Sequence, residues 1–383
     1  MSEDGAPDGE DGTFTVAFTP SGRRGEVPAG ITVLDAARHL GVDLDSVCGG
    51  RGICGRCQVS QGSMPAVPAD PDALTPPGRL EIDYRGRRPI LDGYRLGCAT
   101  HIQGNVVIDV PPESQVHRQV VRKRPEVTNY PIDPVVRLYY VEMAEPSLED
   151  ARSDQERVAA ALEDEWQLAD LVFDHSAAVS LQQALRRGKW AVTVAVHAGH
   201  RVIAAWSGFH DRILGLAYDV GSTTIAGHLL DLSTGDLLES AGRMNPQIRF
   251  GEDLMSRVSY AMMNEGGAAE MTEAVRGALD DLAHELIDQA GVEPSDVVDV
   301  ALVGNPIMHH LVLGFDPRPL GEAPFAPALR QAQDLAASAI GMTIHPGARL
   351  YVLPIVAGHV GADTLGAVLS EGPHRSEALQ LLV

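Results

Sequence analysis

The chain has 383 residues, of which 44% are hydrophobic and 21% are charged, and its mean hydropathy is close to zero at -0.04. This length and composition predict a globular protein of two or three domains and exclude collagen-like, coiled-coil and wholly disordered chains. The 30 Lys and Arg residues against 52 Asp and Glu give a formal charge of -22, which is the wrong sign for a general nucleic-acid binder or a binder of anionic membranes.

The chain shows no membrane-crossing segment and no export signal. No apolar run is near the ~20 residues that cross a bilayer, and the acidic start Ser2-Glu3-Asp4-Gly5 is unlike a signal peptide. We therefore expect a cytoplasmic protein with neither a nucleic-acid nor a membrane partner. Its four cysteines are then expected to be reduced, so metal ligation is considered before disulfide bonding.

The first part of the chain predicts a small domain followed by a linker. Residues 1–12 are polar and predict a disordered tail. Residues 13–111 begin with two short strands, continue with a helix that opens at Thr32, and close with a strand at 106–110, an order typical of a β-grasp domain. Residues 112–134, which include the short basic run 122–124, predict a linker.

The rest of the chain predicts two further domains. Residues 135–207 indicate a small α+β domain of strands and two helices. From residue 213 to 383 we expect two strands joined by a hairpin, a third strand, a long helix at 268–290, and then alternating strands and helices that end with a strand at 378–383. The fold class is therefore a multidomain α+β and α/β protein. Because the last strand stops without a cap, turn or polar tail, we expect the sequence to be a C-terminal truncation.

The four cysteines have the spacing of an iron–sulfur site. Cys48, Cys54 and Cys57 lie in the string CGGRGICGRC, and Cys98 follows in RLGCAT. The spacing C-x5-C-x2-C…C is close to the plant-type [2Fe-2S] spacing C-x4-C-x2-C…C, and the intervening glycines allow the backbone to wrap closely around a cluster. Structural zinc and disulfides are the alternatives, but zinc sites normally use two C-x2-C pairs. This segment resembles the β-grasp [2Fe-2S] ferredoxins, in particular the adrenodoxin type with five residues in the first gap.

The string Asp219-Val-Gly-Ser-Thr-Thr224 places an acid at a strand end before a turn rich in amides and hydroxyls. Such a turn can hold a phosphate without lysine, and the acid can orient Mg²⁺ through water. We therefore take Asp219, Gly221, Ser222, Thr223 and Thr224 as candidate ATP and Mg²⁺ contacts, with an ordinary polar hairpin as the alternative. A P-loop is excluded, since neither of the two lysines lies in a GxxxxGK[ST] string.

The hairpin looks like the first phosphate hairpin of the actin, sugar kinase and chaperone ATPase superfamily, which has a ribonuclease H-like fold. The strings YDVGSTT, ALVGNPIMHHLVLG and VAGHVGADT resemble those of the ferredoxin-fused reductive activators of corrinoid proteins. This resemblance implies a second phosphate hairpin beyond residue 383, so that 213–383 would be the first half of the ATPase domain and would bind ATP weakly or not at all alone. Two departures from the family pattern concern nucleotide contacts, namely Pro306-Ile307 and His359.

The resemblance implies ATP-dependent reduction of the Co(II) corrinoid of a methyltransferase system to Co(I), with a corrinoid protein and an electron donor as partners. Plant-type clusters have potentials near −400 mV, and each ~59 mV of deficit costs a factor of ten for one electron, so ATP would drive an uphill transfer. The alternative is a plain [2Fe-2S] electron carrier whose C-terminal region is a degenerate, nucleotide-free interaction domain. No free catalytic thiol or GxSxG serine is expected, and the adjacent His309 and His310 predict satisfied or exposed side chains, not metal ligands.

Overall fold

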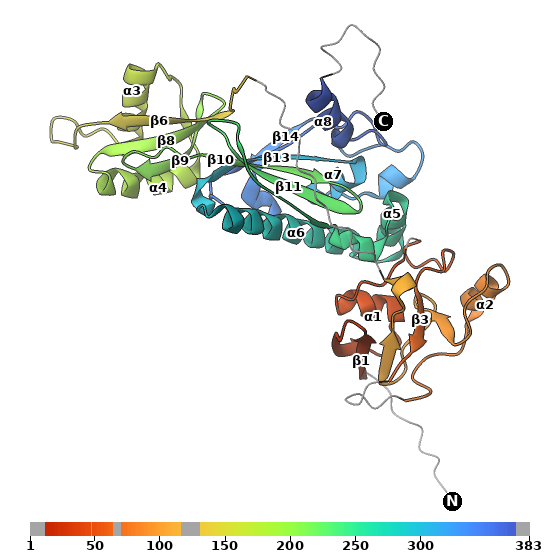
Figure 1. Ribbon diagram of the computed structural model, residues 1–383. Coiled ribbons are helices and arrows are strands. Elements are labelled where there is room, and N and C mark those ends of the chain that lie inside the picture. The colour runs from red at the N-terminus through yellow and green to blue at the C-terminus, as the bar shows by residue number, and fades with distance from the viewer. Residues whose placement is uncertain (1–11, 47, 64–69, 116–130, 373–383) are drawn as a thin grey trace, which may run out of the picture. The chain divides into compact units, whose positions relative to one another are not determined.

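The computed structural model describes residues 12–46, 48–63, 70–115 and 131–372. The chain divides into two compact units, one formed by residues 1–119 and 246–271 and the other by 120–245 and 272–383. Both units mix helices and strands (Figure 1), so the multidomain α+β prediction is confirmed. No helix of the described residues is long and apolar enough to cross a membrane. The predicted strand 378–383 and most of the predicted linker lie outside the described residues.

The first unit contains a five-stranded sheet in the order β2-β1-β5-β3-β4. The strands are β1 (Thr13–Thr19), β2 (Arg24–Pro28), β3 (Gln58–Gln61), β4 (Tyr94–Leu96) and β5 (Val106–Asp109). Strand β1 pairs in parallel with β5 and antiparallel with β2. Because β1 and β5 are parallel, a long crossover connection joins them. This connection contains the helices and the cysteines.

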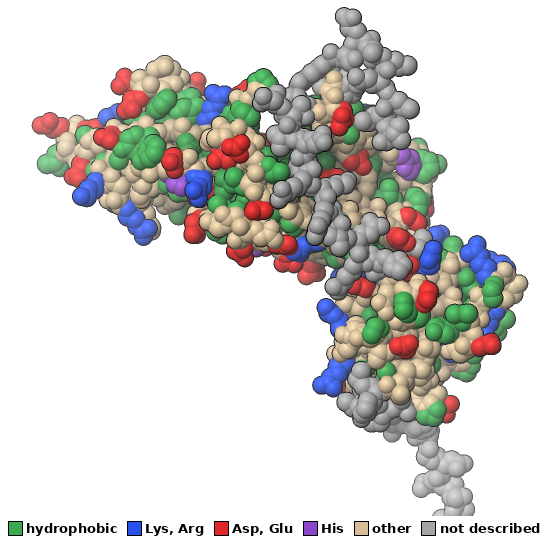
Figure 2. Space-filling model, in the orientation of Figure 1, with side chains coloured by type: hydrophobic (Ala, Val, Ile, Leu, Met, Phe, Trp, Pro, Cys, Tyr) green, Lys and Arg blue, Asp and Glu red, His purple; other side chains and the backbone are tan. Residues whose placement is uncertain are grey.

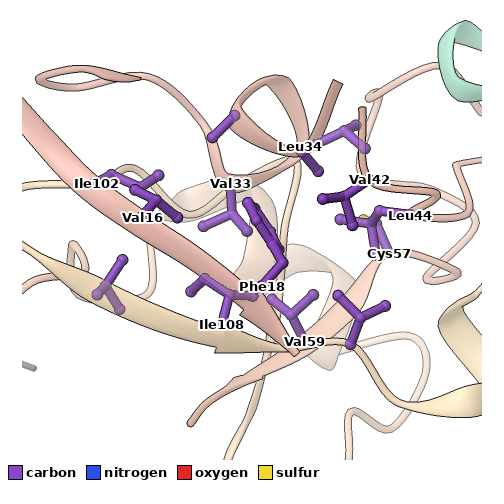
Figure 3. Close-up of a cluster of buried hydrophobic side chains, with 14 of the residues drawn as sticks. Val16, Phe18, Val33, Leu34, Val42, Leu44, Cys57, Val59, Ile102 and Ile108 are labelled. Carbon is purple, nitrogen blue, oxygen red and sulfur yellow. The ribbon is translucent and has the colours of Figure 1, made fainter. Parts of the chain in front are cut away.

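Helix α1 (Val33–His39) begins where the sequence predicts. The Thr32 side chain accepts a hydrogen bond from the amide of Asp35 at 3.0 Å, which caps the helix. Its apolar face packs on the sheet in a buried core that includes Phe18, Leu34 and Ile108 (Figure 3). Cys57 belongs to the same core.

The first unit has further helices that the sequence did not predict. They are α2 (Arg79–Arg85), η1 (Pro112–Ser114), η2 (Pro246–Phe250) and α5 (Leu254–Met263). Arg38 on α1 contacts both η2 and α5. Its Nε donates to the Arg249 carbonyl of η2 at 2.6 Å, and its guanidinium lies 4.6 Å from the centroid of the Tyr260 ring of α5.

The second unit contains two sheets. The smaller has the order β6-β8-β9-β7 and carries two helices. Its elements are β6 (Val136–Glu142), α3 (Asp154–Trp166), β7 (Val172–Phe173), α4 (His175–Arg187), β8 (Ala191–His197) and β9 (Arg201–Ser207). Ser153 and Glu156 form a reciprocal capping box at the start of α3, and a core including Val158, Leu162 and Leu181 covers the sheet.

The larger sheet has six strands in the order β12-β11-β10-β13-β15-β14. The strands are β10 (Leu214–Val220), β11 (Thr224–Asp231), β12 (Leu237–Met244), β13 (Val297–Gly304), β14 (Gln333–Ala336) and β15 (Arg349–Val352). Strands β10, β11 and β12 form antiparallel hairpins, whereas β13 is parallel to β10 and to β15. This arrangement agrees with the predicted order of three strands, a long helix and another strand.

The helices of the larger sheet are α6 (Gly267–Ala290), α7 (Pro306–Leu313) and α8 (Ala362–Glu371), and shorter turns are η3 (Pro294–Asp296), η4 (Arg318–Gly321) and η5 (Ala337–Ile340). A Cβ at Gly227 on β11 would lie 2.9 Å from Leu282 and 3.1 Å from Leu286. The glycine therefore lets α6 approach the hairpin closely.

Candidate functional site

The four cysteines gather in the first unit between α1 and the β3–β4 pair. Cys48, Cys54 and Cys57 lie on the loop that precedes β3, and Cys98 follows β4. Because β3 and β4 are neighbours in the sheet, this topology brings the isolated fourth cysteine to the loop that carries the other three. Cys48 and Cys57 are buried, Cys54 and Cys98 are half-buried, and all four are free thiols.

The four cysteine side chains lie in two neighbouring pairs, Cys48 with Cys54 and Cys57 with Cys98. The Cys54 thiol, helped by the backbone amides of Ile53, Cys54 and Gly50, lowers the pKa of Cys48 to about 4 although burial acts in the opposite direction. The same thiol–thiol bond and burial raise the pKa of Cys54. The bond to Cys98, followed by burial, raises the pKa of Cys57. Backbone amides aimed at the Cys48 sulfur favour negative charge there.

Glycines allow the cysteine loop to take its path. Gly52 and Gly55 have φ of 67° and 70°, in the left-handed region that suits glycine. A Cβ at Gly52 would overlap the Leu80 side chain, and a Cβ at Gly55 would overlap the Tyr84 hydroxyl. Both side chains belong to α2, so this helix packs directly on the loop.

These observations fit a two-iron cluster. Among the described residues, no group of three or more His, Cys, Asp or Glu side chains is arranged to hold a single metal ion. A [2Fe-2S] cluster needs a different arrangement of ligands, because two of its four cysteines bind one iron and the other two bind the second iron. The pairs Cys48–Cys54 and Cys57–Cys98, with amides directed at the sulfurs, supply this donor set.

A buried ion pair anchors α2 to the strand that leads to Cys98. Glu81 is fully buried, and Arg95 Nε lies 3.0 Å from each of its carboxylate oxygens, while Arg95 Nη2 lies 2.9 Å from Oε2. The amide of Leu96 also donates to Glu81 Oε1, at 3.3 Å. Glu81 could not be identified from the sequence, because only the fold brings a helical acid next to β4.

The second candidate site lies in the hairpin between β10 and β11 of the second unit. The Gly221 amide donates to the Thr224 carbonyl at 2.9 Å and closes the turn. Asp219 is exposed on the last residues of β10, while Gly221, Ser222, Thr223 and Thr224 are half-buried. The five predicted residues are therefore together in one tight turn whose amides and hydroxyls lie beside a carboxylate.

The three strings that carry the family resemblance meet at this turn. Val220 and Gly304 are register partners at the ends of the parallel strands β10 and β13. A Cβ at Gly361 would lie 2.7 Å from the Gly304 carbonyl oxygen and 2.7 Å from the Asn305 Cα. Asn305 caps α7, and Gly361 occupies the corresponding position of α8. Two helix N-termini thus meet near the hairpin, and such termini favour anions.

Asn245 is a site residue that the sequence did not reveal. Its backbone amide donates to the Thr223 carbonyl at 2.9 Å, and its side chain donates to the Gly221 carbonyl at 2.8 Å. It therefore fixes the hairpin turn from the end of β12. A single Asn after a strand forms no recognisable sequence motif. Only the pairing of the strands shows that Asn245 belongs to this site.

Pro306 and His359, the two departures from the family pattern, lie at a helix start and beside an aromatic ring. Pro306 is the first residue of α7, where a missing amide hydrogen costs nothing. The His359 ring lies 4.8 Å from that of Phe325.

The prediction for the adjacent histidines is correct for His310 and wrong for His309. His310 is buried and satisfied, since its Nδ1 lies 2.7 Å from the Pro306 carbonyl and its Nε2 accepts from the amide of Ala328 at 2.9 Å. His309 is fully buried, yet neither ring nitrogen has a hydrogen-bond partner. Burial lowers the pKa of His309 to about 4, so it is neutral at pH 7.

Comparisons with known proteins find matches over most of the chain. Residues 126–212 match the family model described as the RACo linker region, and residues 214–376 match the RACo middle region. The chain is 25% identical over 357 residues to the corrinoid activation enzyme RamQ of Eubacterium limosum, covering 92% of this chain and 54% of that protein. It is also similar to the structure of a reductive activator for corrinoid, iron-sulfur protein, with 27% identity and a TM-score of 0.60 over 96% of this chain and 59% of that one.

A shorter match concerns 89 residues, 23% of this chain. They are 32% identical to a component of the Na(+)-translocating NADH-quinone reductase of Haemophilus influenzae (strain PittEE) and cover 19% of that protein. The chain is thus homologous to corrinoid activation enzymes, and it spans between half and three-fifths of the length of the activators it matches.

Proposed function

We propose that this chain, as a homologue of corrinoid activation enzymes, delivers single electrons through a [2Fe-2S] cluster held by Cys48, Cys54, Cys57 and Cys98. Its acceptor is the Co(II) corrinoid of a methyltransferase system, which is reduced to Co(I), and the uphill transfer is coupled to ATP. The observation that carries the proposal is that the pairing of β3 with β4 brings Cys98 to the loop of the other three cysteines, in a chain that resembles a reductive activator.

Several residues of the chain support the cluster role. When bound, a [2Fe-2S] cluster accepts and releases one electron at a time. The amides of Gly50, Ile53 and Cys54 donate to the Cys48 sulfur and favour the more negative, reduced state. Arg51 Nε donates to the Cys48 carbonyl at 3.0 Å and adds a positive charge at the same end of the loop. Leu80 and Tyr84 exclude water from the backbone at Gly52 and Gly55.

The second unit supports the ATP-dependent part of the proposal. The chain order of three antiparallel strands, the long helix α6 and the parallel strand β13 supports the resemblance to the actin and sugar-kinase superfamily. In this proposal Asp219 orients Mg²⁺ through water, and the amides of the segment from Gly221 to Thr224 contact phosphate. Asn245 holds this turn in place.

The proposal is tested by mixing the reduced, cluster-loaded protein with a Co(II) corrinoid protein of a methyltransferase system and following Co(I) formation by its visible absorption. We expect ATP to increase the yield of Co(I). Asp219→Ala should abolish ATP hydrolysis and the ATP effect, whereas Asp236→Ala in the exposed turn between β11 and β12 should leave both unchanged. A cluster-loaded protein that neither hydrolyses ATP nor forms Co(I) would instead favour the plain electron carrier.

A further inference from the structure

We propose that the surface around the cysteine loop and α2 is a docking face for a redox partner protein whose own docking surface surrounds an apolar centre with carboxylates. We call this surface the basic–apolar face and define it by the exposed side chains of residues 49–57 and 79–92. The inference rests on the proposed electron-transfer function and goes beyond it by naming where the partner binds and what chemistry it presents.

The charge of the basic–apolar face is opposite to that of the chain. Residues 49–57 and 79–92 contain six arginines against three acids, whereas the whole chain has a net charge of -22. One of the three acids, Glu81, is fully buried against Arg95 and adds no charge to the surface. The arginines are all exposed, namely Arg51, Arg56, Arg79, Arg85, Arg87 and Arg88.

The face also exposes aliphatic side chains that have no role in the core. Ile53 on the cysteine loop is 48% exposed, and Leu80 and Ile82 on α2 are 42% and 57% exposed. Leu91, just after α2, is 65% exposed. Aliphatic side chains ringed by charge are typical of protein interfaces, whose centre is desolvated and whose rim stays polar.

Direct contacts make the face continuous with the cysteine loop. Leu80 and Tyr84 rest on Gly52 and Gly55. The Leu91 amide donates to Gln58 Oε1 at 3.4 Å, and Gln58 Nε2 donates to the Gly55 carbonyl at 3.0 Å. In Figure 2, blue and green side chains gather where Figure 1 draws α2. A protein bound here would therefore lie directly against the loop that carries three of the four cysteines.

The chemistry of the face favours an acidic protein over other anionic partners. Nucleic acid binding uses cationic and aromatic contacts along a backbone, but this face offers exposed aliphatic residues and no exposed aromatic ring. A carboxylate-rimmed protein would match both the arginines and the aliphatic centre. Charge complementarity of this kind mainly raises the association rate, which suits a transient electron-transfer complex.

The test uses two small one-electron oxidants of opposite charge and the reduced, cluster-loaded chain. Cobalt(III)–EDTA is an anion and tris(ethylenediamine)cobalt(III) is a cation; each takes one electron and becomes cobalt(II), while the reduced protein is oxidised by one electron. A molecule with net charge -22 would repel the anion, so salt would speed its reaction. If the anion reacts at the basic–apolar face, the opposite is expected. Raising the ionic strength from about 0.01 to about 0.1 M shortens the screening length from about 30 to about 10 Å and should lower the rate of the reaction with the anionic oxidant.

Charge reversal locates the effect. Arg87→Glu/Arg88→Glu should slow the anionic oxidant by about tenfold at low salt and speed the cationic one. The control, Arg23→Glu/Arg24→Glu, reverses an adjacent pair at β2, on the sheet edge opposite β3 and β4, and should leave both rates nearly unchanged. Equal rates for the two double variants, or a wild-type anionic rate that rises with salt, would overturn the proposal while leaving the cluster and its electron-transfer role intact.

A binding measurement that needs no redox turnover completes the test. A fluorescein-labelled peptide of alternating Glu and Leu pairs should bind the wild-type chain, as followed by fluorescence anisotropy, and should bind Arg87→Glu/Arg88→Glu at least about tenfold more weakly. Leu91→Asn should also weaken binding without changing its salt dependence, because it removes only apolar contact. Vesicles of phosphatidylglycerol that bind the wild type while the peptide does not would assign the face to a membrane and overturn the assignment to a protein.

Discussion

Replacing Glu81 by Ala should destabilise the first unit strongly. The carboxylate is fully buried, accepts three hydrogen bonds from Arg95 at 2.9–3.0 Å and one from the Leu96 amide at 3.3 Å. Its loss would leave the Arg95 guanidinium, only 17% exposed, without its counter-charge. Breaking a buried pair in this way costs about 3–5 kcal/mol, a large part of the roughly 5–15 kcal/mol that stabilises a typical domain.

The matched control is Asp83→Ala on the same helix. Asp83 lies 3.9 Å from Arg79, and these side chains are 58% and 96% exposed, so this pair should contribute little. Urea unfolding followed by circular dichroism measures both variants. Because Leu80 and Tyr84 adjoin Glu81 on α2 and pack on the cysteine loop, Glu81→Ala should also lose visible absorbance faster in air. Equal unfolding midpoints for the two variants would refute the reasoning.

Three further predictions concern other parts of the chain. His309 has a pKa of about 4 against 6.5 in an exposed histidine, so the unfolded chain binds a proton first and stability should fall by up to about 3 kcal/mol as the pH drops from 6.5 to 4. Thermal melts should show a weaker pH dependence in His309→Leu than in the wild type, and an equal dependence would contradict this. Asn305→Ala removes the cap that accepts from the Met308 amide at 3.0 Å and should cost about 1 kcal/mol, measured by chemical unfolding; a midpoint equal to wild type would contradict this. Arg38→Ala should speed hydrogen exchange in α5, because the contact of the guanidinium with the Tyr260 ring is lost, and unaltered exchange would show that this contact does not hold the helix.

Patterns that are local in sequence predicted most of the elements and the first contacts of each site. The alternating Phe14, Val16 and Phe18 lie in β1, and the helix predicted at 268–290 is α6. The three clustered cysteines and the turn after Asp219 were recognisable because each motif places its functional groups within a few residues of one another. Such signals do not depend on the rest of the fold.

Features that depend on tertiary contact could not be predicted in this way. Helix α2 has seven residues after a proline-rich segment, and packing on Gly52 and Gly55 stabilises it more than its own periodicity does. Asn245 and Gly361 reach the hairpin turn only because β12, β11, β10 and β13 are successive strands of one sheet. The apolar neighbours of His309 on α7 indicate a buried helix, but whether its ring nitrogens find hydrogen-bond partners depends on the packing of α7.

The most direct measurement is the visible absorption and electron paramagnetic resonance spectrum of the anaerobically purified protein before and after dithionite, with iron and sulfide analysis. The account predicts a red-brown protein with about two irons and two sulfides per chain, silent in the resonance spectrum until one electron is added. A colourless chain that contains zinc in place of iron and sulfide, and that remains so after reconstitution, would contradict it.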